Sequence, residues 1–484
     1  MTAPQSLSQS LYRRLADHYL DAMRAGTLAV GDRFPSVRKL MSAHGVSLST
    51  ALQTCRHLED QGWLEARPRS GYYVRLPRRQ GMLPAQEVHA SAPLEAADYV
   101  GIHGRVSEIL ALGQARPVTV NLALAVGAPE LYPGPALQRA MQRTLRAQPN
   151  LLTTMVRRHG HPTLRQALVR RALPRGITAS PDEVVVTHGC IEAVNLALRA
   201  VTQPGDTVAV ESPTFYGLLQ VLETLSVRAL EIPTSPFTGL SLDALAFALE
   251  REPGIKAVVS MPTLHNPLGT VMPDANKERL VRLCAERGIA LIEDDIYGDM
   301  GAGEQPYRAA KSYDTSGHVI YCQSLNKLLA PGLRLGWLLA GRWQARVEML
   351  KYAHSRYSEE LAQVATAGFL DSPAFDRHLR HLRSVLKQQR EQMADGVARH
   401  FPAGTRLSVP EGGMLLWVEL PAGVPGRAVF EQALERGIKL SPGSMFSNGK
   451  RFDHFVRLAC GRPHTAAVEE ALREVGAIVA RLAG

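Results

Sequence analysis

Residues 324–337 read SLNKLLAPGLRLGW and place one lysine, Lys327, in a mostly apolar run. Arg334 follows seven residues later, beyond a Pro-Gly turn. A charged amine in apolar surroundings costs free energy unless its charge is paired or removed by chemistry. The stretch therefore predicts that other polar groups of the chain converge on Lys327.

Short apolar runs alternate with helical segments from Val118 onward. The runs are EVVVTHG, DTVAVES, KAVVSMP, ALIEDD and HVIYCQS, the last of which leads into residues 324–337. This alternation predicts an α/β domain built on a mainly parallel sheet. Because ligands of such sheets bind at the carboxyl ends of the strands, we expect the side chains that follow these runs to form the site.

The groups at these strand ends are an anion cradle, an aromatic ring, an amide, a carboxylate, a phenol, an amine and a guanidinium. The cradle is a helix start, whose backbone N–H groups can hold an anion. The residues are Gly189, Cys190, Ile191, Phe215, Asn266, Asp294, Tyr297, Ser324, Lys327 and Arg334. Few ligands use all of these groups, and pyridoxal 5′-phosphate does.

In this interpretation Lys327, Asp294 and Tyr297 are the catalytic groups. Lys327 forms a Schiff base with the cofactor aldehyde, which removes the cost of a buried amine. Asp294 pairs with the pyridinium nitrogen. Tyr297 and Asn266 hydrogen-bond the ring hydroxyl, and Phe215 stacks on the ring. The phosphate is held by Ser324, Arg334 and the backbone amides of Gly189, Cys190 and Ile191.

The motifs HNPLG, EDDIY, SLNKLLAPGLRLGW and FVRLACG occur in the order typical of fold-type I, aspartate-aminotransferase-like enzymes, which residues 118–484 resemble. The resemblance implies a large part over 118–345, a small C-terminal part over 346–484 and a homodimer. It also implies that Arg457 holds the α-carboxylate of a substrate or effector. Two positions depart from the pattern. Asn326 stands where many relatives carry a hydroxyl residue. Met155 stands near the position where these enzymes usually have a tyrosine that contacts the cofactor phosphate in the neighbouring subunit.

The N-terminal part of the chain is basic. Residues 1–80 contain 12 Arg or Lys against 6 Asp or Glu, within a net charge of +10. Such an excess indicates a polyanion partner or, alternatively, a solvated Arg-rich surface. Apolar periodicity predicts a helix that ends near Gly26, and Ser36 and Ser47 can cap two further helices. Two short strands around RPRSG complete a winged helix-turn-helix.

The stretch GDRFPSVRKL…HGVSLSTALQTCRHLEDQGWLEARPRSGYYV resembles the DNA-binding domain of GntR-family bacterial regulators over residues 8–76. The resemblance implies that Arg38 and the start of the third helix meet DNA. Leu48 and Leu52 stand where family members often carry arginines. The candidate DNA contacts are Ser36, Arg38, Ser47, Ser49, Thr50 and Gln53, with Arg69, Ser70 and Gly71 at the tip of the wing.

The sequence thus predicts a DNA-binding domain over 1–76, a flexible linker over 77–117 rich in Pro, Ala and Gly, and a pyridoxal-phosphate domain over 118–484. This arrangement resembles the MocR-type transcriptional regulators. The resemblance implies a regulator that senses an amino acid or amine through external aldimine formation at Lys327. Alternatives are an active aminotransferase with a regulatory head, and a DNA-binding protein with an empty aminotransferase fold. The basic head favours the regulator.

The chain has 484 residues, 45% of them hydrophobic, which indicates a globular protein of two or three domains. No apolar run reaches membrane-spanning length and no signal-peptide pattern begins the chain. Five cysteines without C-x-x-C spacing argue against a disulfide framework and a zinc site. We expect a cytoplasmic bacterial protein, at the nucleoid when bound to an operator near its own or a neighbouring gene. The effector, the target genes and the direction of regulation stay open.

Overall fold

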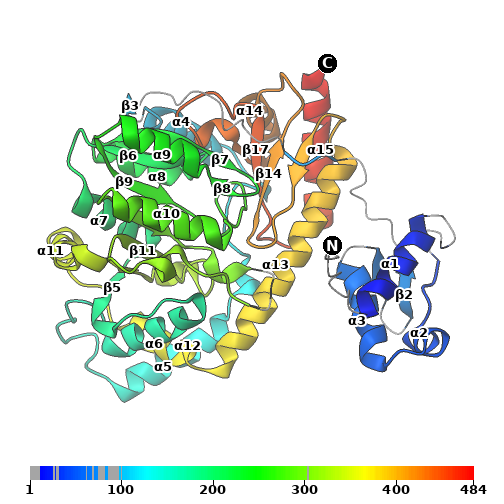
Figure 1. The fold of residues 1–484 in the computed structure, drawn as a ribbon, viewed down its shortest axis with the longest axis horizontal. Helices are drawn as coiled ribbons and strands as arrows, with labels where there is room; N and C mark the ends of the chain where they lie inside the picture. Colours follow the sequence, from blue (N-terminus) through cyan, green and yellow to red (C-terminus); the bar gives the residue numbers. More distant parts are fainter. Residues whose placement is uncertain are drawn as a thin grey trace, which may run out of the picture. The chain divides into compact units, whose positions relative to one another are not determined.

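The computed structural model describes residues 11–24, 28, 32–60, 63–67, 70–74, 82–85, 98–99, 101–301, 303 and 305–484. The chain divides into two compact units, Met1–Gly81 and Met82–Gly484 (Figure 1). Within the described residues, every helix is too short or too polar to cross a membrane.

The N-terminal unit is a winged helix-turn-helix, as predicted. It contains α1 (Leu11–Arg24), α2 (Val37–His44), α3 (Leu48–Asp60) and an antiparallel hairpin of β1 (Leu64–Arg67) and β2 (Gly71–Val74). Ser36 caps α2 by accepting a hydrogen bond from the Lys39 N–H, and Gly45 ends that helix with a φ of 64°. The Ser47 hydroxyl accepts from the Thr50 N–H at 3.2 Å and caps α3. The buried core is made by Leu15, Leu20, Phe34, Leu40, Ala51, Leu58 and Leu64.

A large sheet forms the centre of the second unit (Figure 1). Its strands, in spatial order, are β3 (Asp98–Tyr99), β7 (Arg228–Ser235), β6 (Thr207–Ser212), β9 (Ile255–Ser260), β10 (Ala290–Asp294), β11 (Val319–Ser324), β12 (Gly336–Leu339) and β5 (Val184–Thr187). Strands β7, β6, β9, β10 and β11 pair in parallel, whereas β12 pairs antiparallel with both β11 and β5. β8 (Gly239–Leu240) pairs with β7. The predicted mainly parallel sheet is confirmed.

Helices cover both faces of this sheet because successive strand residues point to opposite sides. Val208 and Val210 share a core with α7 (Cys190–Val201) and α8 (Tyr216–Thr224). Ala209 and Ile232 share another with α9 (Leu242–Arg251) and α10 (Asp274–Glu286). Beside β5, a third group of helices packs together: α5 (Gly134–Ala147), α6 (Pro162–Ala172) and α12 (Leu361–Leu370).

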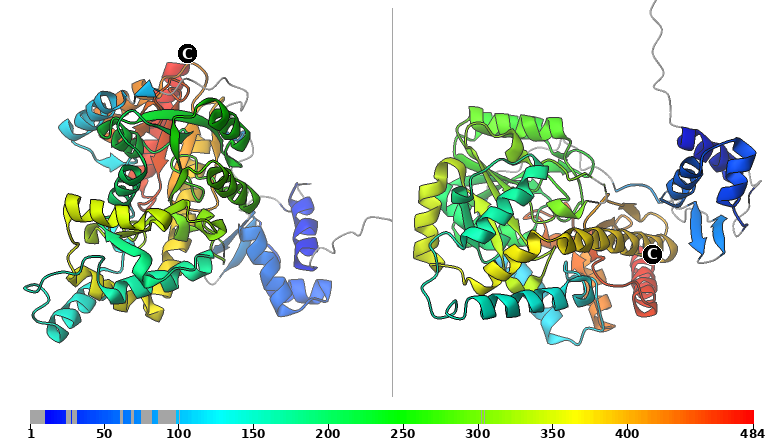
Figure 2. Two further views of the ribbon diagram at one scale, coloured as in Figure 1. Left: turned by 60° about the vertical axis from the view of Figure 1, so that its left-hand side comes forward. Right: turned by 90° about the horizontal axis from the view of Figure 1, so that it is seen from below.

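The C-terminal part is a smaller α+β layer. A four-stranded antiparallel sheet has the order β13 (Arg406–Ser408), β14 (Leu415–Glu419), β17 (Phe455–Ala459) and β16 (Ser441–Pro442). The long helix α13 (Pro373–His400) contacts both α12 and this sheet and can be followed in Figure 2. Completing the part are α14 (Gly426–Glu435), α15 (Ala466–Ala483) and the short pair β4 (Val120–Asn121) and β15 (Ile438–Lys439). Helix α11 (Gln344–Ser355) packs instead on α7.

The prediction of a flexible linker over 77–117 is wrong for residues 82–85, which are hydrogen-bonded to β13, and for its second half. Helix α4 (His103–Ala115) lies there, and Ile102, Val106 and Ile109 are buried in the main core of the second unit. Arg105 also donates to the Ser447 carbonyl at 2.7 Å. The many Ala and Gly residues of this segment weaken its apolar periodicity, but burial against the body stabilises the helix.

Candidate functional site

A cavity of about 250 Å³ lies at the carboxyl ends of the parallel strands. Nine of the residues predicted for the site line it, although they come from segments spread over 268 positions of sequence (190–457). They are Cys190, Ile191, Phe215, Asn266, Asp294, Tyr297, Lys327, Arg334 and Arg457. The predicted convergence on Lys327 is therefore present in the structure.

Lys327 lies in the loop between β11 and β12, and its amine points into the cavity. Its Nζ donates a hydrogen bond to the Ala125 carbonyl at 2.6 Å. Burial, with the positive charges of Arg457 and Arg334 nearby, lowers the pKa of Lys327 to about 8. Near neutral pH the unprotonated, nucleophilic amine is thus far more populated than in an exposed lysine.

Asp294 ends β10 beside the first turn of α7 and is half-buried at the cavity wall. The Cys190 thiol donates to its Oδ1 at 3.1 Å, and the Ile296 N–H donates to the same oxygen at 3.2 Å. Burial raises the pKa of Asp294 to about 6. Burial also raises the pKa of Cys190 well above its usual value, so this thiol stays protonated and acts as a donor. Asp294 is mostly ionised at neutral pH and suited to hold a proton on a ring nitrogen.

Arg457, on β17, is buried and only partly satisfied. Its Nη1 donates to Asn266 Oδ1 at 3.1 Å, and its Nη2 donates to the Ala123 carbonyl at 2.6 Å and to Ser441 Oγ at 3.3 Å. The guanidinium lies 5.0 Å from the ring centre of Phe446. Within the described residues its buried Nε has no hydrogen-bond acceptor. A guanidinium that lines a cavity and bonds only neutral acceptors there fits an anionic ligand such as a carboxylate.

The anion cradle is built where α7 begins. Gly189 has a φ of 89°, and a Cβ at this position would lie 2.8 Å from Asn326 Nδ2 and 3.0 Å from Arg334 Nη2. Arg334 itself has a φ of 53° and donates to the His188 carbonyl at 3.1 Å. The missing side chain at Gly189 leaves the first amides of α7 open beside a guanidinium, which suits a phosphate.

Ser324 is placed differently from the phosphate contact that we expected. It is fully buried and does not line the cavity. Its hydroxyl donates to the Leu335 carbonyl at 3.0 Å and accepts from the Asn326 N–H at 3.1 Å. The residue therefore braces the loop that carries Lys327.

The two aromatic residues lie on the cavity wall. Tyr297 is 2% exposed, and burial raises its pKa above the usual value. Phe215 immediately precedes α8, with its ring centre 4.9 Å from that of Tyr216. Met155, by contrast, is 88% exposed and does not line the cavity.

Several groups of the site were missed in the sequence. The carbonyls of Ala123 and Ala125 accept from Arg457 and Lys327, and Tyr216 and Met261 line the cavity. The alanines lie in an irregular segment after β4, where no spacing or motif marks a backbone acceptor. Cys190 was expected only through its backbone amide, but its side chain contacts Asp294.

The N-terminal unit exposes the predicted contacts of its second and third helices. Ser36, Arg38, Ser47, Ser49 and Gln53 are exposed, and Thr50 is half-buried. The Ser47 hydroxyl also contacts Ser49 Oγ and Thr50 Oγ1, each at 2.9 Å, so these hydroxyls are tied to the helix start.

The wing is defined in part. Ser70 Oγ contacts the Tyr73 hydroxyl at 2.6 Å, and Gly71 has a φ of 102° that a turn requires. The Arg67 guanidinium lies 4.3 Å from the ring centre of Tyr73. Arg69 lies outside the described residues.

Comparison with known proteins gives the same division. Residues 11–74 match the family of bacterial regulatory proteins described as the gntR family, and residues 121–475 match aminotransferase class I and II. The HTH-type transcriptional regulator YjiR of Escherichia coli is 35% identical, in an alignment that covers 97% of this chain and 99% of YjiR. The regulator YdcR of the same organism is 34% identical, with 97% of this chain and 98% of YdcR covered. The α-aminoadipate aminotransferase LysN of Thermus thermophilus, solved with N-(5′-phosphopyridoxyl)-L-leucine, is 26% identical, with a TM-score of 0.72 over 79% of this chain and 96% of its own.

Proposed function

The chain belongs to the HTH-type transcriptional regulators of the GntR family that carry an aminotransferase class I and II domain, the MocR type, and we propose that this domain is their sensor for an amino acid or amine. The observation that carries the proposal is the pair of Lys327 and Arg457 in one cavity, an amine of lowered pKa beside a buried guanidinium that bonds neutral acceptors.

Pyridoxal 5′-phosphate is the cofactor of the second unit. The residues present fit it, because the open amides at Gly189 and the Arg334 guanidinium suit its phosphate, and half-buried Asp294 suits its ring nitrogen. When bound, the cofactor supplies an aldehyde that reacts with primary amines and a ring that withdraws electrons.

The residues of the cavity have separate roles in the proposed sensing. Lys327 would supply the primary amine that holds the cofactor aldehyde, and its lowered pKa keeps a larger share of that amine neutral. Asp294, which accepts from the Cys190 thiol, would hold a proton on the ring nitrogen. Asn266 lines the cavity with Arg457 and accepts a hydrogen bond from its Nη1, so it would help to orient the guanidinium toward a carboxylate.

The lining also indicates the kind of effector. Among the described lining residues the charged side chains are Asp294, Lys327, Arg334 and Arg457, and each already has a partner group in the proposal. A second charge on the effector would be buried without an opposite charge, which costs free energy. The lining that this subunit supplies therefore favours an amino acid or amine with an uncharged side chain.

A homodimer is part of the proposal. Leu124 and Ile191 line the cavity yet are 45% and 43% exposed, and a partner subunit would cover them. A two-fold dimer presents two DNA-binding units to two half-sites. Sedimentation equilibrium at micromolar concentration tests this part, and a monomer would contradict it.

The test of the sensor uses the full-length protein loaded with cofactor. The visible absorption band is titrated with the twenty common L-amino acids and simple amines, and the affinity for DNA from upstream of the gene is measured with each responsive compound. We expect one class of compounds to shift the band and change operator affinity, and Lys327→Ala to abolish both responses. An operator response that survives in Lys327→Ala would refute the sensor. Steady transamination without any operator response would favour the alternative of an active aminotransferase.

A further inference from the structure

The four-stranded sheet of the second unit links Arg457 to residues 82–85, which are the first described residues after the N-terminal unit. Arg457 on β17 lies directly opposite Trp417 on β14, and Trp417 lies directly opposite Ser408 on β13. β13 is the edge strand of this sheet. Ser408 in turn accepts a hydrogen bond from the backbone N–H of Ala85 at 3.1 Å. The four residues form one row across the sheet, which we call the Arg457–Ala85 row.

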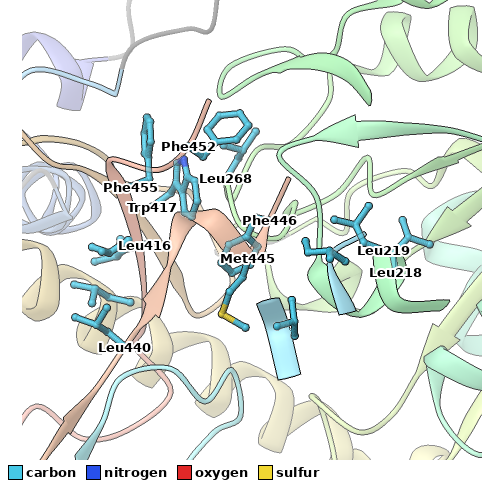
Figure 3. Close-up of a cluster of buried hydrophobic side chains, with 14 of the residues drawn as sticks. Leu218, Leu219, Leu268, Leu416, Trp417, Leu440, Met445, Phe446, Phe452 and Phe455 are labelled. Atoms are coloured by element: carbon cyan, nitrogen blue, oxygen red, sulfur yellow. The ribbon is translucent and has the colours of Figure 1, made fainter. Parts of the chain in front are cut away.

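The row is tightly packed at its centre. Residues directly opposite in neighbouring strands point to the same face of a sheet. The Arg457 guanidinium contacts the ring of Phe446, and that ring meets Trp417 edge-on with 5.3 Å between centres. Trp417 also stacks on Phe455 at 5.1 Å with an angle of 12° between the rings. Figure 3 shows these aromatic side chains gathered together. Such a packed cluster moves as a body and does not absorb a displacement of one member.

At the other end of the row, residues 82–85 are attached to β13. The Leu407 N–H donates to the Leu83 carbonyl at 3.1 Å, and Ala85 is 5% exposed. Met82 packs against the main core of the unit. Since the N-terminal unit ends at Gly81, the place where the chain enters the second unit is fixed to the sheet that carries Arg457.

We propose that a carboxylate bound by Arg457 acts on the attachment of residues 82–85 through the Arg457–Ala85 row, and that this is how the effector alters DNA binding. The inference rests on the proposed function and deepens it by naming the route of regulation. It requires two arrangements of the sheet that differ both in carboxylate affinity and in the hydrogen bonds to residues 82–85.

The test is a comparison of serine variants in the full-length, cofactor-loaded protein. Ser408→Ala removes the acceptor for Ala85, and Ser408→Thr keeps a hydroxyl. Ser316→Ala is the matched control, because it removes a hydroxyl that bonds Asp314 and His318 in the loop before β11. The probes are the L-amino acids that shift the absorption band and, for each, the amine that lacks its carboxylate. The readouts are the absorption shift, the ratio of operator Kd with and without the probe, and hydrogen exchange of peptides that span 82–85 and 406–408.

In the wild type we expect amino acids to change both the operator ratio and the exchange of these peptides, and the matched amines to shift the band only. In Ser408→Ala the operator ratio should fall by about fivefold, which is what one neutral hydrogen bond contributes, while the absorption titration with the matched amines is unchanged. Ser408→Thr and Ser316→Ala should keep the wild-type ratio. The route is refuted if Ser408→Ala keeps the wild-type ratio. It is also refuted if amino acids that change operator affinity leave the hydrogen exchange of residues 82–85 unchanged. Neither result contradicts the proposal that the domain is a sensor. If no compound changes operator affinity in the wild type, the sensor and the route both fall.

Discussion

Replacing Gly336 with alanine measures how closely the lysine loop and the anion cradle are packed. Gly336 begins β12, and a Cβ there would lie 2.5 Å from the carbonyl carbon and 2.7 Å from the Cα of Gly189. Because the contact is with backbone, the two segments must separate by roughly 0.5 Å. Overpacking of this kind lowers the free energy of unfolding by about 1–3 kcal/mol.

Cofactor affinity should respond to the same displacement of Gly189. Moving the Gly189 amides away from the phosphate weakens a charge-assisted hydrogen bond worth about 1.5–3 kcal/mol, so the Kd for pyridoxal 5′-phosphate should rise by about 10- to 150-fold. Urea unfolding and absorbance titration of the cofactor measure the two effects. Gly332→Ala is the control, since a Cβ there meets nothing within 4 Å and both quantities should stay near wild type. Equal behaviour of the two variants would refute this account of the cradle.

Three further predictions concern the effector, the lysine and the DNA. In the absorbance titration, Arg457→Gln should weaken the binding of L-amino acids by about 10- to 150-fold and leave the binding of amines without a carboxylate unchanged. Equal losses of affinity for both would exclude a carboxylate contact. Because the pKa of Lys327 is lowered from 10.5 to about 8, reconstitution of cofactor-free protein should speed up with pH until about 8 and then level off. The unfolded chain holds that proton up to its ordinary pKa, so the free energy of unfolding should also rise between pH 8 and 10.5, a slope that Lys327→Met removes. Gln53→Ala should lower operator affinity by about 1–3 kcal/mol in fluorescence anisotropy, and an equal loss on unrelated DNA would show that Gln53 reads no base.

The residues of the cavity could be found in the sequence because parallel sheets bring strand ends together. Asp294 and Lys327 each follow an apolar run, so topology alone places them at one edge. The charge and hydrogen-bonding capacity of each side chain then indicated which part of the cofactor it would contact. The same reasoning did not foresee the bond that Ser324 makes here, because a hydroxyl at a strand end can also bond the next strand, and this one donates to the Leu335 carbonyl.

Contacts between remote segments were beyond sequence reasoning. The bonds from Arg457 to Asn266 and Ala123 join residues 191 and 334 positions apart, and no local pattern encodes them. Helix α4 was missed for a related reason. Its stability comes from burial of Val106 and Ile109 against the body, and this tertiary contribution outweighs the weak helical signal of the segment.

The burial of every cysteine has a practical consequence. Cys55, Cys190, Cys284, Cys322 and Cys460 are free thiols, and all are buried. A single cysteine introduced at the exposed Asp17 position of α1, which is not among the predicted DNA contacts, would therefore react with a maleimide dye far faster than any native thiol. Fluorophores attached in this way would let single-molecule energy transfer follow the spacing of two heads on one operator while an amino acid is added.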